Sequence, residues 1–245
     1  HRDLHSFPTR RSSDLAAMGW RMCFGAMSLL ALVLMVWVRL KVPDFAGQTA
    51  HRRLSLRHVF ALPGVRPVLF AVLAFVLAHN ILYTYIAPFL ARARMVESTD
   101  RVLLLFGVTS LLSIGIIGAL IDRHLRALTL MSTVMFGLSA LALGMAGTEA
   151  IIVYAAVGGW GLAFGGAATL FQTALAKTAG DAADVAQSML VTVWNAAIAG
   201  GGIVGGVLLD RLGVGAFSPA LLTLLVVTAG VAWSARPYGF PPPAE

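Results

Sequence analysis

The sequence predicts an all-α membrane protein with seven transmembrane helices. Hydrophobic residues make up 58% of the 245-residue chain, and charged residues make up 12%, against about a quarter in an ordinary globular protein. Several apolar runs reach the roughly 20 residues that a helix needs to cross a bilayer. None shows the alternation of a barrel strand. The composition therefore excludes a soluble domain.

The apolar runs are separated by short polar connections. They are roughly Trp20–Val38, Pro67–Leu90, Val102–Ile121, Ala127–Ala146, Ala150–Phe171, Val185–Leu209 and Ala216–Ala235. Little more than Gly147, Thr148 and Glu149 separates the fourth run from the fifth, which predicts a tight hairpin. In the second run, Pro88 removes a backbone donor and crowds the carbonyl of Thr84, so we expect a bend near the end of that run.

The first fifteen residues, HRDLHSFPTRRSSDL, lack apolar periodicity and are excluded from the predicted fold. They resemble translated sequencing-adapter sequence, and a natural polar loop is the alternative. After them, the basic residues of alternate connections predict the orientation. The set expected in the cytoplasm is the richer one, which holds Arg39, Lys41, Arg52, Arg53, Arg57, Arg66, Arg123, Arg126, Lys177 and Arg236. The other set holds Arg21, Arg92, Arg94, Arg101 and Arg211. The C-terminus is then cytoplasmic, in a cell (inner) membrane.

Although the net charge is +7, the basic residues are scattered between apolar runs, which excludes a nucleic-acid partner. The longest connection, residues 41–66, includes HRRLSLRHVF. This stretch has two interpretations. One is a short interfacial helix that places leucines among headgroups and arginines on the anionic lipid bilayer. The other is a solvated cytoplasmic linker.

The stretch GALIDRHLR combines glycine, an acid and three basic side chains between two apolar runs. Gly118 allows a neighbouring helix to approach closely, and Asp122 is placed to accept hydrogen bonds at a helix N-terminus. Arg123 and Arg126 can pair with carboxylates or phosphates. We call Gly118, Asp122, Arg123 and Arg126 the gate motif, because such contacts can form in one conformation and break in another. The alternative is simple orientation by positive charge. A second G-x-x-x-D-R, at Gly206 to Arg211, falls on the opposite face.

Four strings, in order, resemble the major facilitator superfamily of transporters, in its sugar-efflux and drug:proton antiporter branch (arabinose efflux permease-like). GWRMCFGAMSLLAL with the following VPD is similar to the sixth helix of that family, and YTYIAPFL to the end of its seventh. GALIDRHLR resembles the loop between helices eight and nine, although Ala127 stands where the fuller motif has a second basic residue. The stretch from Gln187 through VTVWNAAIAGGGIVGGVLLDRLG resembles the eleventh helix. The resemblance covers Gly19 to Pro237.

This resemblance implies that the seven runs are helices 6–12 of a twelve-helix major facilitator fold, with helices 1–5 as the missing partner. The expected domains are an artefact or disordered tail (1–15), the last helix of the N-terminal bundle (16–40), a cytoplasmic interdomain linker (41–66), the C-terminal six-helix bundle (67–236) and a cytoplasmic tail (237–245). The implied function is export of a small molecule, such as a drug, sugar or metabolite, by proton antiport with alternating access.

Polar groups at mid-membrane depth are the candidates for a substrate cavity, because burying them in lipid is costly. His79 and Tyr83 lie one turn apart with Asn80 beside them, and Ser188, Thr192 and Asn195 keep helical phase in the sixth run. Trp160 and Phe164 offer an aromatic wall. The resemblance likewise places helices seven, ten and eleven around the cavity. For close helix packing, the small-x-x-x-small pairs are Gly161 with Gly165, Gly201 with Gly205, and Gly202 with Gly206.

Other interpretations stay open. His79 is either a neutral core histidine or a group that binds substrate or a proton, Asn195 either bridges helices or binds substrate, and Trp160 either packs or lines the cavity. Acidic residues are absent at mid-membrane depth, since Asp122 and Asp210 stand at the ends of runs. We expect no metal, no cofactor and no catalytic residue. A seven-helix receptor and an intramembrane enzyme, with His79 and Ser110, are the alternatives to transport.

Overall fold

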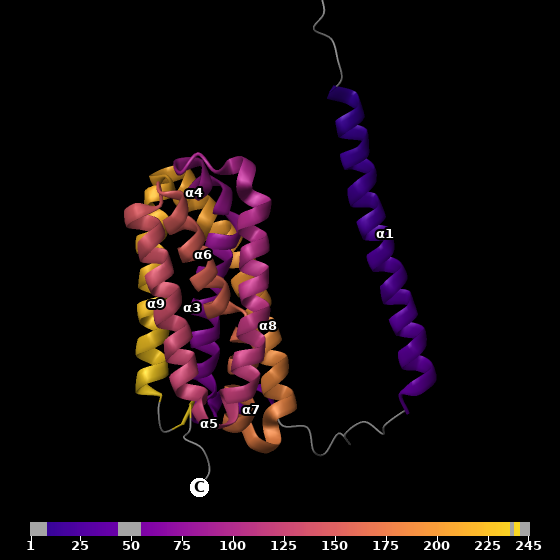
Figure 1. Ribbon diagram of the computed structural model, residues 1–245. Helices are drawn as coiled ribbons and strands as arrows, with labels where there is room; N and C mark the ends of the chain where they lie inside the picture. Colours follow the sequence, from indigo (N-terminus) through magenta and orange to yellow (C-terminus); the bar gives the residue numbers. More distant parts are fainter. Residues whose placement is uncertain (1–8, 44–54, 236–237, 241–245) are drawn as a thin grey trace, which may run out of the picture. The chain divides into compact units, whose positions relative to one another are not determined.

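The computed structural model describes residues 9–43, 55–235 and 238–240, and over these residues it is entirely helical. The chain divides into two compact units, residues 1–53 and 54–245, which are drawn in Figure 1. Residues 1–8, 44–54, 236–237 and 241–245, which include parts of the predicted tail, linker and C-terminal segment and Arg236 of the predicted cytoplasmic set, lie outside the described residues.

The first unit contains one long helix, α1 (Thr9–Lys41). Its stretch Phe24–Lys41 is apolar and long enough to cross a membrane. The helix begins well before the predicted start at Trp20 and includes Thr9–Leu15, which the sequence analysis excluded from the fold. Residues 9–18 contain neither glycine nor proline, so no residue there opposes the extension of the helix.

The second unit begins with a short helix, α2 (Leu56–Ala61), in the HRRLSLRHVF stretch. The hydroxyl of Ser55 caps it by accepting a hydrogen bond from the backbone N–H of His58 at 3.2 Å. Val59 is buried, whereas Leu56 and Phe60 are exposed. Gly64 then adopts a φ of 88° at the start of the next helix, a conformation that favours glycine.

The second apolar run forms two helices, α3 (Val65–Thr84) and α4 (Ile86–Arg92), separated at Tyr85. The predicted bend is confirmed, and it lies just before Pro88. Because Pro88 crowds the carbonyl four residues earlier, α3 ends at Thr84, and Pro88 falls in the first turn of α4, where its missing N–H is not needed. The Tyr85 hydroxyl donates to the carbonyl of Gly202 at 2.7 Å and ties this break to another helix.

The third and fourth runs form α5 (Thr99–Ala146), preceded by a single 3₁₀ turn, η2 (Val96–Ser98). His124, with φ −130° and ψ 24°, is the non-helical residue that divides α5 into two arms. GALIDRHLR is therefore helical on both sides of one kinked residue and is not an extended connection. The continuous apolar stretch Val96–Ala146 holds 51 residues, more than twice the length that one crossing requires.

The fifth run is also divided, into α6 (Ala150–Phe164) and α7 (Ala167–Ala179), with Gly165 and Gly166 between them. The end of this run was predicted at Phe171, but the helix continues to Ala179. Lys177 does not mark the end of the helix, because its long side chain carries the charge to the surface from a helical position. Side chains of α5 bond to the break: the Ser113 hydroxyl accepts from Gly166 N–H at 3.1 Å, and the Ser110 hydroxyl donates to Gly161 carbonyl at 3.2 Å.

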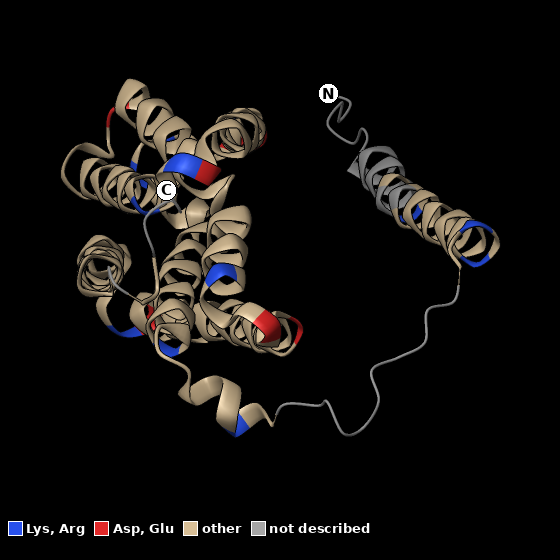
Figure 2. Ribbon diagram, turned by 90° about the horizontal axis from the view of Figure 1, so that it is seen from below, with Lys and Arg blue, Asp and Glu red and all other residues tan. Residues whose placement is uncertain are grey.

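The last two runs form α8 (Ala183–Leu212) and α9 (Phe217–Ser234), each preceded by a short 3₁₀ turn, η3 (Gly180–Ala182) and η4 (Val214–Ala216). In the second unit, α3 packs against α8 and α9, and α5 packs against α6 and α9. Figure 2 shows that charged residues occupy only short segments of the helices, and that most of each helix has no charged residue. By length and composition, five apolar helical stretches among the described residues are able to cross a membrane.

Glycines let the helices approach closely at most of the predicted positions. A Cβ at Gly201 would lie 2.5 Å from Asn80 Cβ, and one at Gly205 would lie 2.5 Å from the Tyr85 ring, whose hydroxyl is 2.9 Å from the Cβ position of Gly206. On α6, the Cβ position of Gly161 is 2.6 Å from the Phe106 carbonyl oxygen, and that of Gly165 is 2.5 Å from Ser110 Cα. Gly202 differs, because no described atom comes within 4 Å of its Cβ position.

These adjacent glycines give a matched pair of substitutions. Gly201→Ala is expected to lower the free energy of unfolding by about 1–3 kcal/mol, because its methyl group would push α8 away from α3. Gly202→Ala is expected to leave it unchanged or raise it by up to about 1 kcal/mol, since alanine favours a helix interior. Helix content followed by circular dichroism during thermal unfolding in detergent measures both. Equal losses in the two variants would contradict the packing described for α3 and α8.

The hydroxyl at the α6–α7 break gives a second prediction. Ser113→Ala leaves the Gly166 N–H buried without an acceptor, so we expect a loss of about 1–3 kcal/mol in the same measurement. Ser139→Ala is the control, because Ser139 is also a buried serine of α5 but donates to Met135 carbonyl of its own helix. Its removal should cost clearly less. A similar cost for both serines would mean that Ser113 does not support the break.

Candidate functional site

Rings from three of the bundle's helices form a cluster that includes His79. We call Phe75, His79, Tyr83, Phe106, Phe136, Trp160 and Phe164 the aromatic cluster. His79 is 7% exposed and stacks on Phe164, with ring centroids 3.3 Å apart and planes within 5°. The indole N–H of Trp160 donates to His79 Nδ1 at 3.2 Å. Because Nδ1 accepts this bond, the neutral imidazole carries its proton on Nε2.

This geometry agrees with the interpretation of His79 as a histidine bonded to a neighbouring helix, and a role in substrate or proton binding stays a prediction. Tyr83 lies at the edge of the cluster: its ring stacks on His79 at 5.5 Å between centroids, and the residue as a whole is 47% exposed. Asn80 donates to Val76 carbonyl of its own helix at 2.9 Å and packs against Gly201. Asn80 therefore contributes to helix packing.

The second part of the predicted cavity is the polar face of α8, formed by Ser188, Thr192 and Asn195. All three side chains are exposed. Each donates to a carbonyl of its own helix: Ser188 to Val185 at 2.7 Å, Thr192 to Ser188 at 3.0 Å, and Asn195 to Val191 at 2.8 Å. These internal bonds satisfy the two hydroxyl protons and one of the two amide N–H groups of Asn195, while the oxygen atoms stay available to a ligand.

The structure does not bring the two parts into direct contact. Phe164 and Trp194, with ring centroids 6.2 Å apart, connect the aromatic cluster to α8, and Trp194 lies on a different side of α8 from the polar face. Sequence reasoning missed Phe75, Phe106 and Phe136. The spacing of Phe75, His79 and Tyr83, four residues each, was a usable signal for the first. The sequence around the two phenylalanines of α5 contains no such signal, because their position depends on how both arms of α5 pack.

The gate motif surrounds the α5 kink. Asp122 and Arg123 are exposed, and no described atom lies within 4 Å of a Cβ position at Gly118. Arg126 is engaged with α9: its Nη2 donates to Trp233 carbonyl at 3.2 Å, and its guanidinium lies 4.9 Å from the centre of the Trp233 ring. Trp233 stands in the last turn of α9, where carbonyls lack helical partners. Arg126 thus caps a helix end.

Metal-binding groups are absent from the part of the chain that the structure describes, where no three His, Cys, Asp or Glu residues come together. The side chains around His79 are aromatic, and those on the α8 face are hydroxyls and an amide. This arrangement is suited to stacking and hydrogen bonding of an uncharged organic molecule.

Comparison with known proteins identifies the relatives. The model of a family described as the Major Facilitator Superfamily matches residues 15–202. The purine ribonucleoside efflux pump NepI of Salmonella paratyphi C is 29% identical over 222 residues, which cover 87% of this chain and 55% of the pump. The same pump of Shigella sonnei is 27% identical over 220 residues, with coverages of 87% and 56%, and that of Escherichia coli K12 is 26% identical over 215 residues, with coverages of 86% and 54%. The chain spans about half the length of these curated relatives. No solved structure matches it significantly.

The bond between Trp160 and His79 is testable by a double-mutant cycle. His79→Phe leaves the indole N–H unpaired, and Trp160→Phe leaves Nδ1 unpaired, so each change is expected to destabilise the fold. Replacing both by phenylalanine removes both polar groups, so the double variant should be more stable than the sum of single losses by about 1–3 kcal/mol. Chemical denaturation in detergent measures the coupling. His79→Phe combined with Trp233→Phe, at an exposed indole, is the control and should be additive.

Proposed function

The chain belongs to the major facilitator superfamily, whose members are multi-pass membrane transporters and not enzymes, and we propose that it is the C-terminal part of a secondary exporter of small molecules. The proposed seven spans are α1, α3 with α4, the two arms of α5, α6 with α7, α8, and α9. They correspond to helices 6–12 of the family fold. The match to about half of each efflux pump supports this assignment. The family membership removes the receptor and the intramembrane enzyme as alternatives.

The observation that carries the proposal is the open polar face of α8. Ser188, Thr192 and Asn195 are exposed and donate to carbonyls of α8 itself, and Ser188 and Thr192 line an open groove beside α2. Polar groups facing lipid are costly, so such a face belongs against a water-filled cavity or a partner. In a transporter of two helical halves, the substrate site lies near the midplane where the halves meet. We therefore assign this face to the substrate cavity.

The relatives' names and the side chains support one substrate class. The related pumps export purine ribonucleosides, by name, and a molecule of that class has a flat aromatic base and a sugar with several hydroxyls. The exposed ring of Tyr83 offers a surface for stacking, and the oxygens of Ser188, Thr192 and Asn195 offer partners for hydroxyl groups. We propose a purine ribonucleoside or a similar planar metabolite as cargo, with His79, Trp160 and Phe164 supporting Tyr83 from behind.

We propose proton antiport as the driving reaction, with alternating access by rocking of the two halves. The carboxylates Asp122 and Asp210 stand at helix ends and not at mid-membrane depth, so the coupling acid is expected in the other half. The Arg126 contact with α9 closes one helix end at the proposed cytoplasmic face, and the exposed Asp122 and Arg123 are the parts of the gate motif left to meet that other half. The distribution of basic residues predicts a cytoplasmic C-terminus.

The transport test uses this chain extended at its N-terminus by the first five helices of one of the related efflux pumps. In inverted membrane vesicles, an imposed proton gradient should drive uptake of a radiolabelled purine ribonucleoside. Thr192→Val should lower uptake about tenfold, the equivalent of one good hydrogen bond to the substrate. Thr223→Val is the matched control, because Thr223 is an exposed threonine of α9 that also bonds to its own helix, at Pro219 carbonyl.

Three outcomes decide the proposal. Gradient-driven uptake that is lost in Thr192→Val and kept in Thr223→Val supports it. Equal uptake by both variants would remove α8 from the substrate site. Transport by the 245-residue chain alone in liposomes would show that a second half is not needed. This result would contradict the proposed arrangement of two halves.

A further inference from the structure

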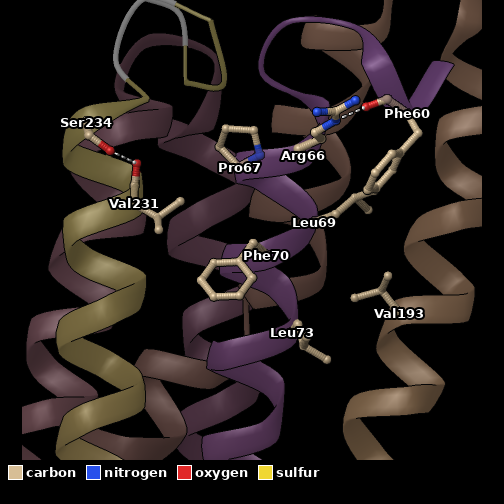
Figure 3. Close-up of a pocket in the computed structure, with 9 residues that line it drawn as sticks. All are labelled: Phe60, Arg66, Pro67, Leu69, Phe70, Leu73, Val193, Val231 and Ser234. Atoms are coloured by element: carbon tan, nitrogen blue, oxygen red, sulfur yellow. Dashed lines mark hydrogen bonds between the residues drawn. The ribbon is translucent and has the colours of Figure 1, made fainter. Parts of the chain in front are cut away.

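A groove runs along the exposed side of α3 between α8 and α9. Figure 3 shows its side chains: Leu69, Phe70 and Leu73 project from α3, Val193 from α8, and Val231 from α9. The groove has a volume of about 490 Å³. Its one hydroxyl, on Ser234, donates to Val231 carbonyl at 3.2 Å. The walls therefore offer almost nothing to a polar ligand, which would lose its hydrogen bonds to water on entering.

An arginine is held at the mouth of this groove. Arg66 Nε donates to Phe60 carbonyl at 3.0 Å, and the guanidinium lies 5.0 Å from the centre of the Phe60 ring. These two contacts fix the plane of the guanidinium, while its terminal nitrogens make no hydrogen bond with any residue that the structure describes. A fixed, exposed fork of donors matches two oxygens of a phosphate group.

A second arginine stands at the same end. An adjoining groove of about 530 Å³ includes Arg57 and shares Phe60, Leu69 and Val193 with the first, and its far wall is formed by Ser188 and Thr192 of the polar face of α8. Each groove has one arginine and no acidic residue among its lining residues. The mouth therefore carries positive charge, and the apolar walls extend below it from Arg66 to Leu73, over about 10 Å of helix rise.

We propose that this groove is a binding site for an anionic phospholipid. One acyl chain lies along Phe70 and Leu73, and the phosphate is bound by Arg66, with Arg57 adding attraction. The charge of the mouth, the apolar walls and their order along α3 match the headgroup and the tail of such a lipid. By the distribution of basic residues, the mouth faces the cytoplasmic leaflet, where anionic lipids attract basic residues next to the membrane. The short helix α2 closes one side of the site, because its Phe60 holds Arg66.

The test uses the full chain in phosphatidylcholine nanodiscs that contain a small fraction of photoactivatable lipid. Two probes share the same diazirine-bearing acyl chain, and they differ in headgroup: phosphatidylglycerol or phosphatidylcholine. After illumination, mass spectrometry of peptides measures labelling around Phe70, Leu73 and Val231. The phosphatidylglycerol probe is expected to label these segments at least about fivefold more than the phosphatidylcholine probe, the ratio that one arginine near the surface provides.

Variants separate the headgroup from the tail. Arg66→Gln should reduce phosphatidylglycerol labelling to the level of the neutral probe, whereas Lys177→Gln, which removes an exposed charge outside both grooves, should not. Leu73→Trp fills the groove and should reduce labelling by both probes there. Circular dichroism checks that each variant keeps its helices.

Equal labelling by the two probes, or full phosphatidylglycerol labelling in Arg66→Gln, would overturn the proposal. A groove that neither probe labels in the wild-type chain would also overturn it, because a protein segment would then be covering these side chains.

Discussion

The need to satisfy every backbone polar group without water governs this molecule. A helix meets that need with its own backbone hydrogen bonds, which favours helices in an apolar chain. Each interruption of a helix exposes amides and carbonyls that require other partners. The second unit has such interruptions at Tyr85 and at Gly165–Gly166, and side-chain hydroxyls tie both to other helices; at the second, Ser113 supplies the acceptor for the Gly166 N–H. The Tyr85 hydroxyl bonds to Gly202 carbonyl, and Ser113 and Ser110 bond to Gly166 and Gly161. The breaks are therefore also the points where helices are tied together.

The same need explains what could be predicted from the sequence. Long apolar runs and Pro88 are local signals, so the helical class and the bend in the second run followed from them. The break at Gly165–Gly166 is bonded to serines of α5 that lie about fifty residues earlier in the chain, and no local pattern predicts such a partner. The extension of α1 to Thr9 was missed for another reason: composition argued against residues 1–15, although residues 9–15 contain neither glycine nor proline to oppose a helix.

The candidate site also has one part that local sequence signals predict and one part that depends on tertiary packing. The polar face of α8 could be read directly from helical spacing, because Ser188, Thr192 and Asn195 belong to one helix. The aromatic cluster could be predicted only in part, since Phe106 and Phe136 come from different arms of α5 and meet Trp160 through tertiary packing. Arg126 shows a similar limit. Its motif indicated a surface arginine, but its bond to Trp233 carbonyl follows from the neighbouring position of α9.

The divided span made by α6 and α7 has a mechanical consequence. Trp160 and Phe164 stand on α6, whereas Lys177 stands near the end of α7, so the glycine pair separates the residues around His79 from the surface end of the same span. A continuous helix would transmit a tilt along its whole length. At this join, glycines interrupt the helix and two serine hydroxyls of α5 bond to it from the side, so the join is the point of the span where bending costs least and where α5 controls its angle.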